Sequence, residues 1–566
     1  MSSDFPILSL LVWLPIVGAI VVALLPGAQA HLLKVVGLGV SLATLVLGVV
    51  AALQFDTGSG ARQLEEVHTW IDAFGVHYAL GVDGLGLLMV LLTVLLVPLV
   101  LAAEWFKADA PGGAGARSFV AWTLALEGLS LAVFCATDVF LFYVVFEATL
   151  IPAYFLIGGF GREGRGAVAL KFLMFQLAGG LILLASVIGL YVISAQQGEA
   201  SYLLSDLERL TIDTEPGRWL FLGFFIAFAI KAPLFPVHTW LADTTGNATP
   251  GTGVLLVCIL DKIGTFGMLR FCLGLFPEAS QWATPVVITL ALVSIVYGAL
   301  LAIGQDDVFR LVGLTSLSHF GLITLGIFTF SSQGGTGAIL YMVNHGLGTA
   351  ALFLTAGYLA ERRGTTLISR MGGVEKVTPV LAGLLLVAGL ATLGLPGLST
   401  FVSEFLVLLA AFDHAWYVGA IAVTAVVLSA IYVLWMYQRA FTGPTVDPVG
   451  PDGPDGTDDS EARVDDAAPE DAAAAPSDGG GGVAVAERTA APVAHRVESD
   501  RDLGLREIVA VAPLVAALVF FGFYPKPLLD AADPTVAQLL QRVGVDDGAP
   551  TVSPDSVPAA TQEGED

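Results

Sequence analysis

About fourteen apolar runs, each close to the length that crosses the hydrocarbon layer of a bilayer, constrain this chain more than any other feature. They lie near 6–26, 33–54, 84–104, 116–136, 138–159, 168–194, 218–238, 252–275, 283–303, 308–330, 335–360, 379–411, 416–440 and 507–530. Lipid offers no hydrogen-bond partners, so each run must satisfy its backbone N–H and C=O groups internally. The runs therefore predict an all-α polytopic membrane protein with about fourteen transmembrane helices.

The composition supports this fold class and excludes several functions. The chain is 55% hydrophobic and only 13% charged, with a mean hydropathy of +0.80, too apolar for a water-soluble protein. Cys135, Cys258 and Cys272 all lie in apolar runs without CxxC spacing, so we expect no metal cluster, disulfide or redox cofactor in this chain. The residues before the first run include Asp4 but no Lys or Arg. A signal peptide would begin with basic residues, so we interpret this run as a permanent span.

Basic residues predict the orientation. Loops after even-numbered runs hold Arg62, Arg209 and Arg218, whereas most other loop Lys and Arg residues follow odd-numbered runs. Because cytoplasmic loops are enriched in Lys and Arg, we expect both termini outside a cell membrane.

Two acidic segments, 445–502 and 534–566, supply most of the formal net charge of −25. They are rich in Ala, Gly, Pro and Asp, and are predicted to be a disordered cytoplasmic linker and an acidic tail. A solvated linker is the simplest interpretation; a cation-binding or docking role is the alternative. Such acidity also suits a salt-rich cytoplasm, as in halophiles.

Ionisable side chains interrupt several apolar runs. The candidate site residues are Glu147, Lys231, Lys262, His319, His345 and Glu404. Each charge at the bilayer centre costs roughly 2.5–3.5 kcal/mol on insertion scales, so a shared function is the economical explanation. Together they predict a polar path through the membrane.

Two spans carry helix breakers beside these residues. Pro233 and Pro236 follow Lys231 in span 7, and a Gly-Leu-Pro-Gly stretch at 394–397 precedes Glu404 in span 12. Each broken helix is the fourth of a five-helix unit, spans 4–8 and 9–13, which predicts two inverted repeats around a transport site. The expected parts are spans 1–3 with an outer loop (1–115), the two repeats (116–275 and 276–444), the linker (445–502), span 14 (503–533) and the tail (534–566).

Structural roles remain as alternatives. Glu147 and Lys231 suit a buried ion pair, and Lys262 could merely neutralise Asp261, although successive helical residues point about 100° apart. His319 and His345 are each compatible with a satisfied core histidine. Three further groups are Glu127 and Asp138, which suit packing or proton access, and His238, whose role stays open.

In combination, five segments resemble the proton-pumping, antiporter-like membrane subunits of respiratory complex I, which are related to Mrp antiporter chains. The segments are Val-Phe-Glu147-Ala-Thr-Leu-Ile-Pro, Lys231-Ala-Pro-Leu-Phe-Pro-Val-His, Thr-Ser-Leu-Ser-His319-Phe-Gly, Asn-His345-Gly and Gly394-Leu-Pro-Gly-Leu-Ser-Thr-Phe-Val-Ser-Glu404. The resemblance covers about residues 5–530 apart from the linker.

The resemblance implies that Glu147 and Lys231 form the gating pair of a cytoplasmic half-channel. Lys262 would be the central relay, and His319 and His345 would continue a hydrated axis. The driving reaction would be quinone reduction in partner subunits, which would hold the quinone, flavin and iron–sulfur centres. The implied partners are antiporter-like L and N chains and the lipid bilayer, with protons as cargo and no nucleic acid.

Within that family the chain most resembles M-type subunits, the type of the fourth mitochondrial ND chain. Glu404 stands where the L and N chains and Mrp chains usually carry lysine, and it would exchange the proton with the outer half-channel. Departures from the family pattern are Phe309 before Arg310, Ala242-Asp243-Thr-Thr in place of Pro-Asp-Ala-His, and Asp261 where an apolar residue is usual. An Mrp-type Na⁺/H⁺ antiporter and a non-pumping structural subunit remain the alternative functions.

Overall fold

The computed structural model describes residues 5–27, 29–105, 115–198, 200–446 and 501–545, so the predicted linker lies almost wholly outside the described residues. The first half of the chain forms α1 (Ile7–Leu24), α2 (Ala30–Gln54), β1 (Gln63–Ile71), β2 (Val76–Val82), α3 (Gly84–Ala103), α4 (Gly115–Cys135), α5 (Val139–Ala148), α6 (Leu150–Phe160), α7 (Arg165–Gln197), α8 (Leu204–Leu207), α9 (Thr214–Lys231), α10 (Leu241–Asn247), α11 (Pro250–Val254) and α12 (Lys262–Gly267). The second half forms α13 (Pro277–Ile303), α14 (Val308–Phe328), α15 (Ser332–Arg363), α16 (Pro379–Thr392), α17 (Ser399–His414), α18 (Trp416–Ala422), α19 (Thr424–Phe441), α20 (Leu505–Phe523) and α21 (Lys526–Val543).

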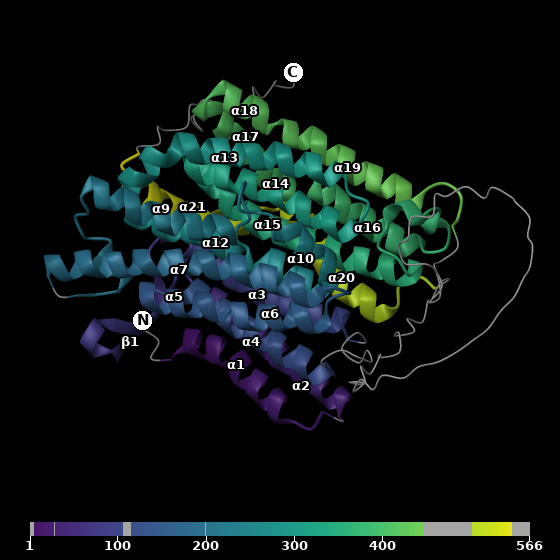
Figure 1. The fold of residues 1–566 in the computed structure, drawn as a ribbon, viewed down its shortest axis with the longest axis horizontal. Coiled ribbons are helices and arrows are strands. Elements are labelled where there is room, and N and C mark those ends of the chain that lie inside the picture. The colour runs from purple at the N-terminus through teal and green to yellow at the C-terminus, as the bar shows by residue number, and fades with distance from the viewer. Residues whose placement is uncertain (1–4, 28, 106–114, 199, 447–500, 546–566) are drawn as a thin grey trace, which may run out of the picture.

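The predicted all-α membrane fold is confirmed. Twelve helical stretches among the described residues are long and apolar enough to cross a membrane, and most run alongside one another in one bundle (Figure 1). The two other predicted runs, 218–238 and 379–411, coincide with broken helices: α9 ends at Lys231, and six residues separate α16 from α17. The number fourteen and the inverted relation of the two five-helix units stay predictions.

Polar side chains begin several helices. A side chain just before the helix accepts a hydrogen bond from a backbone N–H of the first turn, which would otherwise lack a partner. The capping residues are Asp83 for α3, Asp138 for α5, Thr249 for α11, Asp307 for α14 and Ser331 for α15. The carboxylates at these positions therefore set helix boundaries.

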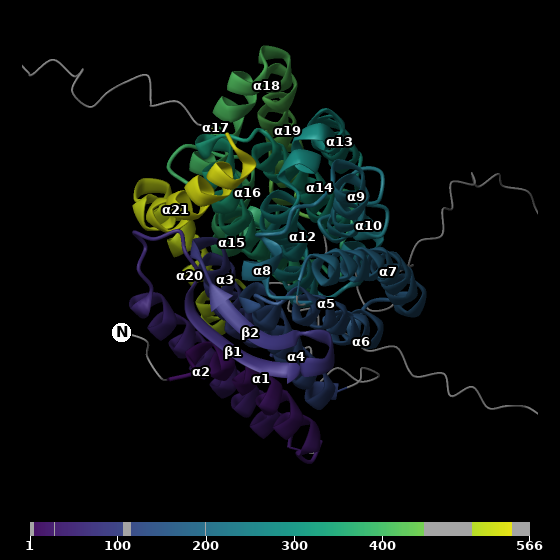
Figure 2. The ribbon, with the colours of Figure 1, turned by 90° about the vertical axis from the view of Figure 1, so that its left-hand side faces the viewer.

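The segment predicted as an outer loop contains a β-hairpin. β1 and β2 pair antiparallel, with Thr69 opposite His77, and Gly75 in the turn has φ of 63°. The hairpin lies across one end of the bundle (Figure 2), where the His77 N–H donates to the Asp138 carboxylate over 2.9 Å. Asp138 therefore joins the hairpin to the start of α5.

The expectation that residues after 533 form a polar tail was wrong for 534–543. Span 14 is α20, which ends at Phe523, and α21 then runs from Lys526 to Val543 and packs against α3 and α15. One face of α21 buries Leu528, Ala532, Val536 and Leu540, and the charged residues lie on the other. This amphipathic spacing stabilises a helix on the bundle.

The centre of the bundle is formed by three spans that face no lipid. The apolar windows of 250–273, α14 and α15 are entirely buried, whereas less than half of the window is buried in α1, α2 and α20. These three central spans carry Lys262, His319 and His345. The ionisable residues are therefore enclosed by protein, as the cost of charge in lipid requires.

Candidate functional site

Glu147 and Lys231 lie at the first helix break. Lys231 is the last residue of α9 and is 1% exposed; its Nζ donates to Thr149 Oγ1 over 3.4 Å and lies 4.8 Å from the Phe146 ring centroid. Glu147 is the penultimate residue of α5, and its Oε1 is buried without a hydrogen-bond partner. Among the ion pairs of the described residues, none joins Glu147 to Lys231. Glu147 and Lys231 therefore interact without a direct ion pair, and Thr149, between α5 and α6, is the hydrogen-bond partner of the lysine.

A glycine accommodates the Glu147 carboxylate. A Cβ at Gly180 in α7 would overlap Glu147 Oε1, and a Cβ at Gly394 would likewise overlap Glu404 Oε2. Gly394 lies in the break between α16 and α17 with φ of 75°, a conformation that glycine adopts readily. Both candidate glutamates thus pack against a glycine, a pairing that the sequence pattern did not reveal.

Lys262 occupies the middle of an unusual helix. π-helical segments Leu255–Leu260 and Met268–Leu273 flank the short α12 on both sides. Such segments are rare and concentrate at functional sites, because the wider turn re-aims side chains. The Lys262 side chain is fully buried, its Nζ lies 2.6 Å from His345 Nδ1, and it sits 4.3 Å from the Phe320 ring centroid.

The two histidines continue the row from Lys262. Their ring centroids are 5.1 Å apart, and His319 Nε2 lies 3.3 Å from the Tyr432 hydroxyl on α19. Tyr432 is buried and interacts electrostatically with Glu404. Sequence reasoning missed Tyr432, because a single tyrosine in an apolar run carries no distinguishing signal. The observed order is Lys262, His345, His319, Tyr432, with Glu404 beyond.

Glu404 lies in the second turn of α17 and is 6% exposed. Asn344, next to His345, donates to the Ser399 carbonyl over 2.8 Å and to Ser403 Oγ over 3.3 Å. These bonds fix the start of α17 relative to α15. Ser403, the residue before Glu404, is thus bonded to Asn344, the residue before His345.

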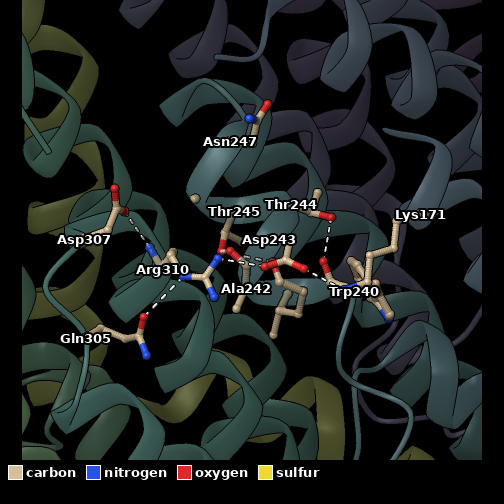
Figure 3. Close-up of polar contacts among 12 residues, drawn as sticks. Lys171, Trp240, Ala242, Asp243, Thr244, Thr245, Asn247, Gln305, Asp307 and Arg310 are labelled. Atoms are coloured by element: carbon tan, nitrogen blue, oxygen red, sulfur yellow. Dashed lines mark hydrogen bonds and ion pairs between the residues drawn. The ribbon is translucent and has the colours of Figure 1, made fainter. Parts of the chain in front are cut away.

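An ion network joins the two predicted repeats (Figure 3). Asp243 in α10 binds Lys171 over 2.6 Å and Arg310 over 2.7 Å, and Arg310 also donates to Gln305 over 3.2 Å. Burial alone would raise the pKa of Asp243, but the two cations hold it below its usual value. The departures from the family pattern at 242–245 and 309 thus lie at or beside ion pairs that connect α10 to α7 and α14.

The remaining candidates have separate surroundings. Glu127 is 1% exposed with neither oxygen hydrogen-bonded, and His238 packs against the rings of Phe235 and Tyr297 at 6.0 and 5.5 Å. Asp261 is 2% exposed, and its Oδ2 has no hydrogen-bond partner. In the described part of the chain, no cluster of three or more His, Cys, Asp and Glu side chains could hold a metal ion.

Replacing Gly180 by alanine tests the placement of Glu147. The new methyl group is expected to push the Glu147 carboxylate aside. For the proton path that the sequence predicts, translocation should then fall by up to about 10²-fold, since small misplacements of reacting groups can have effects of that size. The measurement is quinone-driven proton uptake by inverted vesicles.

Gly179→Ala is the matched control, because a Cβ there would meet Ile230 Cδ1 at 3.3 Å and Ala227 Cα at 3.5 Å, away from Glu147. Equal pumping by the two variants would contradict this placement.

A row of enclosed ionisable groups between two broken helices is the arrangement of an ion-translocating membrane chain. A sequence model of the family NADH:quinone oxidoreductase/Mrp antiporter matches residues 136–429, and the chain belongs to that family. It is 44% identical to NADH-quinone oxidoreductase subunit M of Mycobacterium tuberculosis, over 97% of both chains. It is 32% identical to NADH-ubiquinone oxidoreductase chain 4 of Arabidopsis thaliana, over 94% of this chain and 97% of that one.

A solved structure has the same architecture. A chain of respiratory complex I from Thermus thermophilus superposes with a TM-score of 0.78 at 31% identity, covering 95% of this chain and all of that one. The predicted resemblance to the M-type subunits of complex I is thereby confirmed.

Proposed function

We propose that the chain translocates protons as a membrane-arm subunit of a quinone-reducing respiratory complex. The observation that carries this proposal is the buried row from Lys262 through His345 and His319 to Tyr432, with a broken helix beside it at each end. A structural subunit would have no need of enclosed ionisable groups, which membrane helices tolerate only at a cost.

Proton transfer along this row requires only the making and breaking of N–H and O–H bonds. Burial disfavours the charged form of each group and a nearby opposite charge favours it, so a changed contact between two groups moves the proton. Lys262 Nζ and His345 Nδ1 already share a hydrogen bond, across which a proton can pass. If Glu147 and Lys231 formed an ion pair, the charged form of the lysine would be favoured. Separation of the two side chains would release the proton from Lys231 toward Lys262.

The energy must come from outside this chain. Each proton moved against the membrane potential requires about 2.3 kcal/mol per 100 mV. We infer that partner subunits supply it through quinone reduction, that those subunits hold the flavin and iron–sulfur centres, and that antiporter-like L and N chains are neighbours. In this proposal the complex is an NADH or other donor:quinone oxidoreductase and translocase of the cell membrane, with both termini of the chain outside.

Lys231→Met tests the proposed function directly. The variant keeps the side-chain length and removes the charge, so the complex should assemble while quinone-driven proton uptake by inverted vesicles falls by about 10² or more, as for loss of an acid–base group. Assembly is checked on a native gel. If electron transfer and pumping persist while Na⁺/H⁺ exchange disappears, the chain is an Mrp-type antiporter; if nothing changes, its role is structural.

A further inference from the structure

Asp261 is a second buried charge next to Lys262. It lies at the junction of the first π-helical segment with α12, where its N–H donates to the Leu256 carbonyl over 2.9 Å. The residue is 2% exposed and its Oδ2 has no hydrogen-bond partner. A buried carboxylate oxygen without a hydrogen bond is costly, which calls for an explanation beyond packing.

Neutralising Lys262 does not explain Asp261. The Lys262 ammonium bonds to His345 on α15 at 2.6 Å, and no ion pair within 4.0 Å joins the adjacent Asp261 and Lys262, both of which the structure describes. Consecutive helical residues point about 100° apart, so the two side chains leave the helix in different directions. Asp261 therefore forms no direct ion pair with Lys262.

Asp261 lies on the side of its helix that packs against the end of α9, where the first helix break occurs. Gly264, one turn further along, packs so closely on α9 that a Cβ would lie 2.5 Å from the Ala232 N and the Phe228 O. Residues three apart share a helix face, so Asp261 is directed toward the end of α9, where Lys231 lies. Lys262 and Lys231 are the two cations that interact electrostatically with Asp261.

We infer that Asp261 is an additional proton-binding site of this chain, which receives a proton from Lys231 and passes it to Lys262. This inference rests on the proposed function. The N–H bond of the Lys231 ammonium breaks, its electron pair stays on Nζ, and the proton passes through water to form an O–H bond on the Asp261 carboxylate. That O–H bond then breaks, its electron pair stays on the carboxylate, and the proton passes through water to neutral Lys262 Nζ. No other reactant is needed.

The test uses the complete complex in inverted vesicles and compares wild type with Asp261→Asn, Asp261→Glu and Lys262→Met. Asp261→Asn keeps the shape but cannot hold a proton, and its pumping rate should fall by about tenfold or more, as for loss of a proton-transfer group. Asp261→Glu should retain most of the activity. Quinone-induced infrared difference spectra should show the carbonyl band of a protonated aspartic acid in wild type.

The infrared band separates proton binding from a merely structural role. With isotope-labelled aspartate the band should shift in wild type and be absent from Asp261→Glu, in which labelled glutamate should shift a new band instead. This measurement stands even if Asp261→Asn fails to assemble. Absence of the band from a wild type that pumps, or normal pumping by Asp261→Asn, would overturn the inference alone.

Failure of the proposed function has a different signature. If wild type itself does not pump during quinone reduction, or if Lys262→Met pumps normally, the proposed function is wrong and the relay through Asp261 is wrong with it.

Discussion

Replacing Lys262 by methionine is expected to stop proton translocation by this chain. The side chain is fully buried between two π-helical segments, and its ammonium is bonded to His345 at 2.6 Å. Methionine fills a similar volume but neither binds nor donates a proton, so the row would lose its central member. Loss of an acid–base group typically costs about 10²–10⁴-fold in rate. The measurement is quinone-driven proton uptake by inverted vesicles. We expect either fewer protons taken up per electron or loss of quinone reduction coupled to proton uptake.

Lys526→Met is the matched control for this substitution. Lys526 is an exposed lysine at the start of α21, paired with Asp530 over 2.8 Å, and its removal also deletes one positive charge. Exposed pairs contribute only about 0–1 kcal/mol, so pumping and assembly should stay unchanged. Normal pumping by Lys262→Met, with assembly verified, would refute the relay.

Breaking the ion pair between Arg270 and Asp83 should produce the largest loss of stability. The guanidinium binds the carboxylate through two contacts of 2.5 and 2.8 Å, and both side chains are less than a tenth exposed. Asp83 also caps α3 by accepting from the Gly86 N–H over 2.9 Å. Arg270→Met leaves that carboxylate buried and unpaired, which should lower the free energy of unfolding by about 3–5 kcal/mol. Thermal unfolding of the purified complex would measure the change.

Two further variants give this prediction its controls. Arg439→Met removes an arginine whose bond to Asp306 spans 3.0 Å between side chains that are 35% and 39% exposed, and it should cost at most about 1 kcal/mol. The double variant Asp83→Asn with Arg270→Met removes both charges and should recover part of the lost stability. Equal destabilisation by Arg270→Met and Arg439→Met would contradict the argument from burial.

Local sequence patterns were sufficient to predict the features that depend only on neighbouring residues, namely the membrane helices and the two helix breaks. Apolar runs of about 20 residues predict helices because each crossing must satisfy its own backbone. Pro233 and Gly394 indicated both helix breaks, since each acts on the turn in which it stands. The hairpin β1–β2 and helix α21 were missed. Strand pairing depends on a partner segment, and the acidic composition of the residues that follow α21 concealed the narrow apolar face of this helix.

The sequence by itself determined the membrane class, the enclosed ionisable positions and the family pattern, because the cost of burying backbone and charge in lipid applies residue by residue. Only the tertiary structure decided which of these groups meet. Lys262 reaches a histidine 83 residues away, His319 reaches a tyrosine 113 residues away, and the Glu147 carboxylate packs against Gly180. Such contacts depend on how distant helices pack, and a hydrogen bond requires a separation near 3 Å that no spacing along one helix specifies.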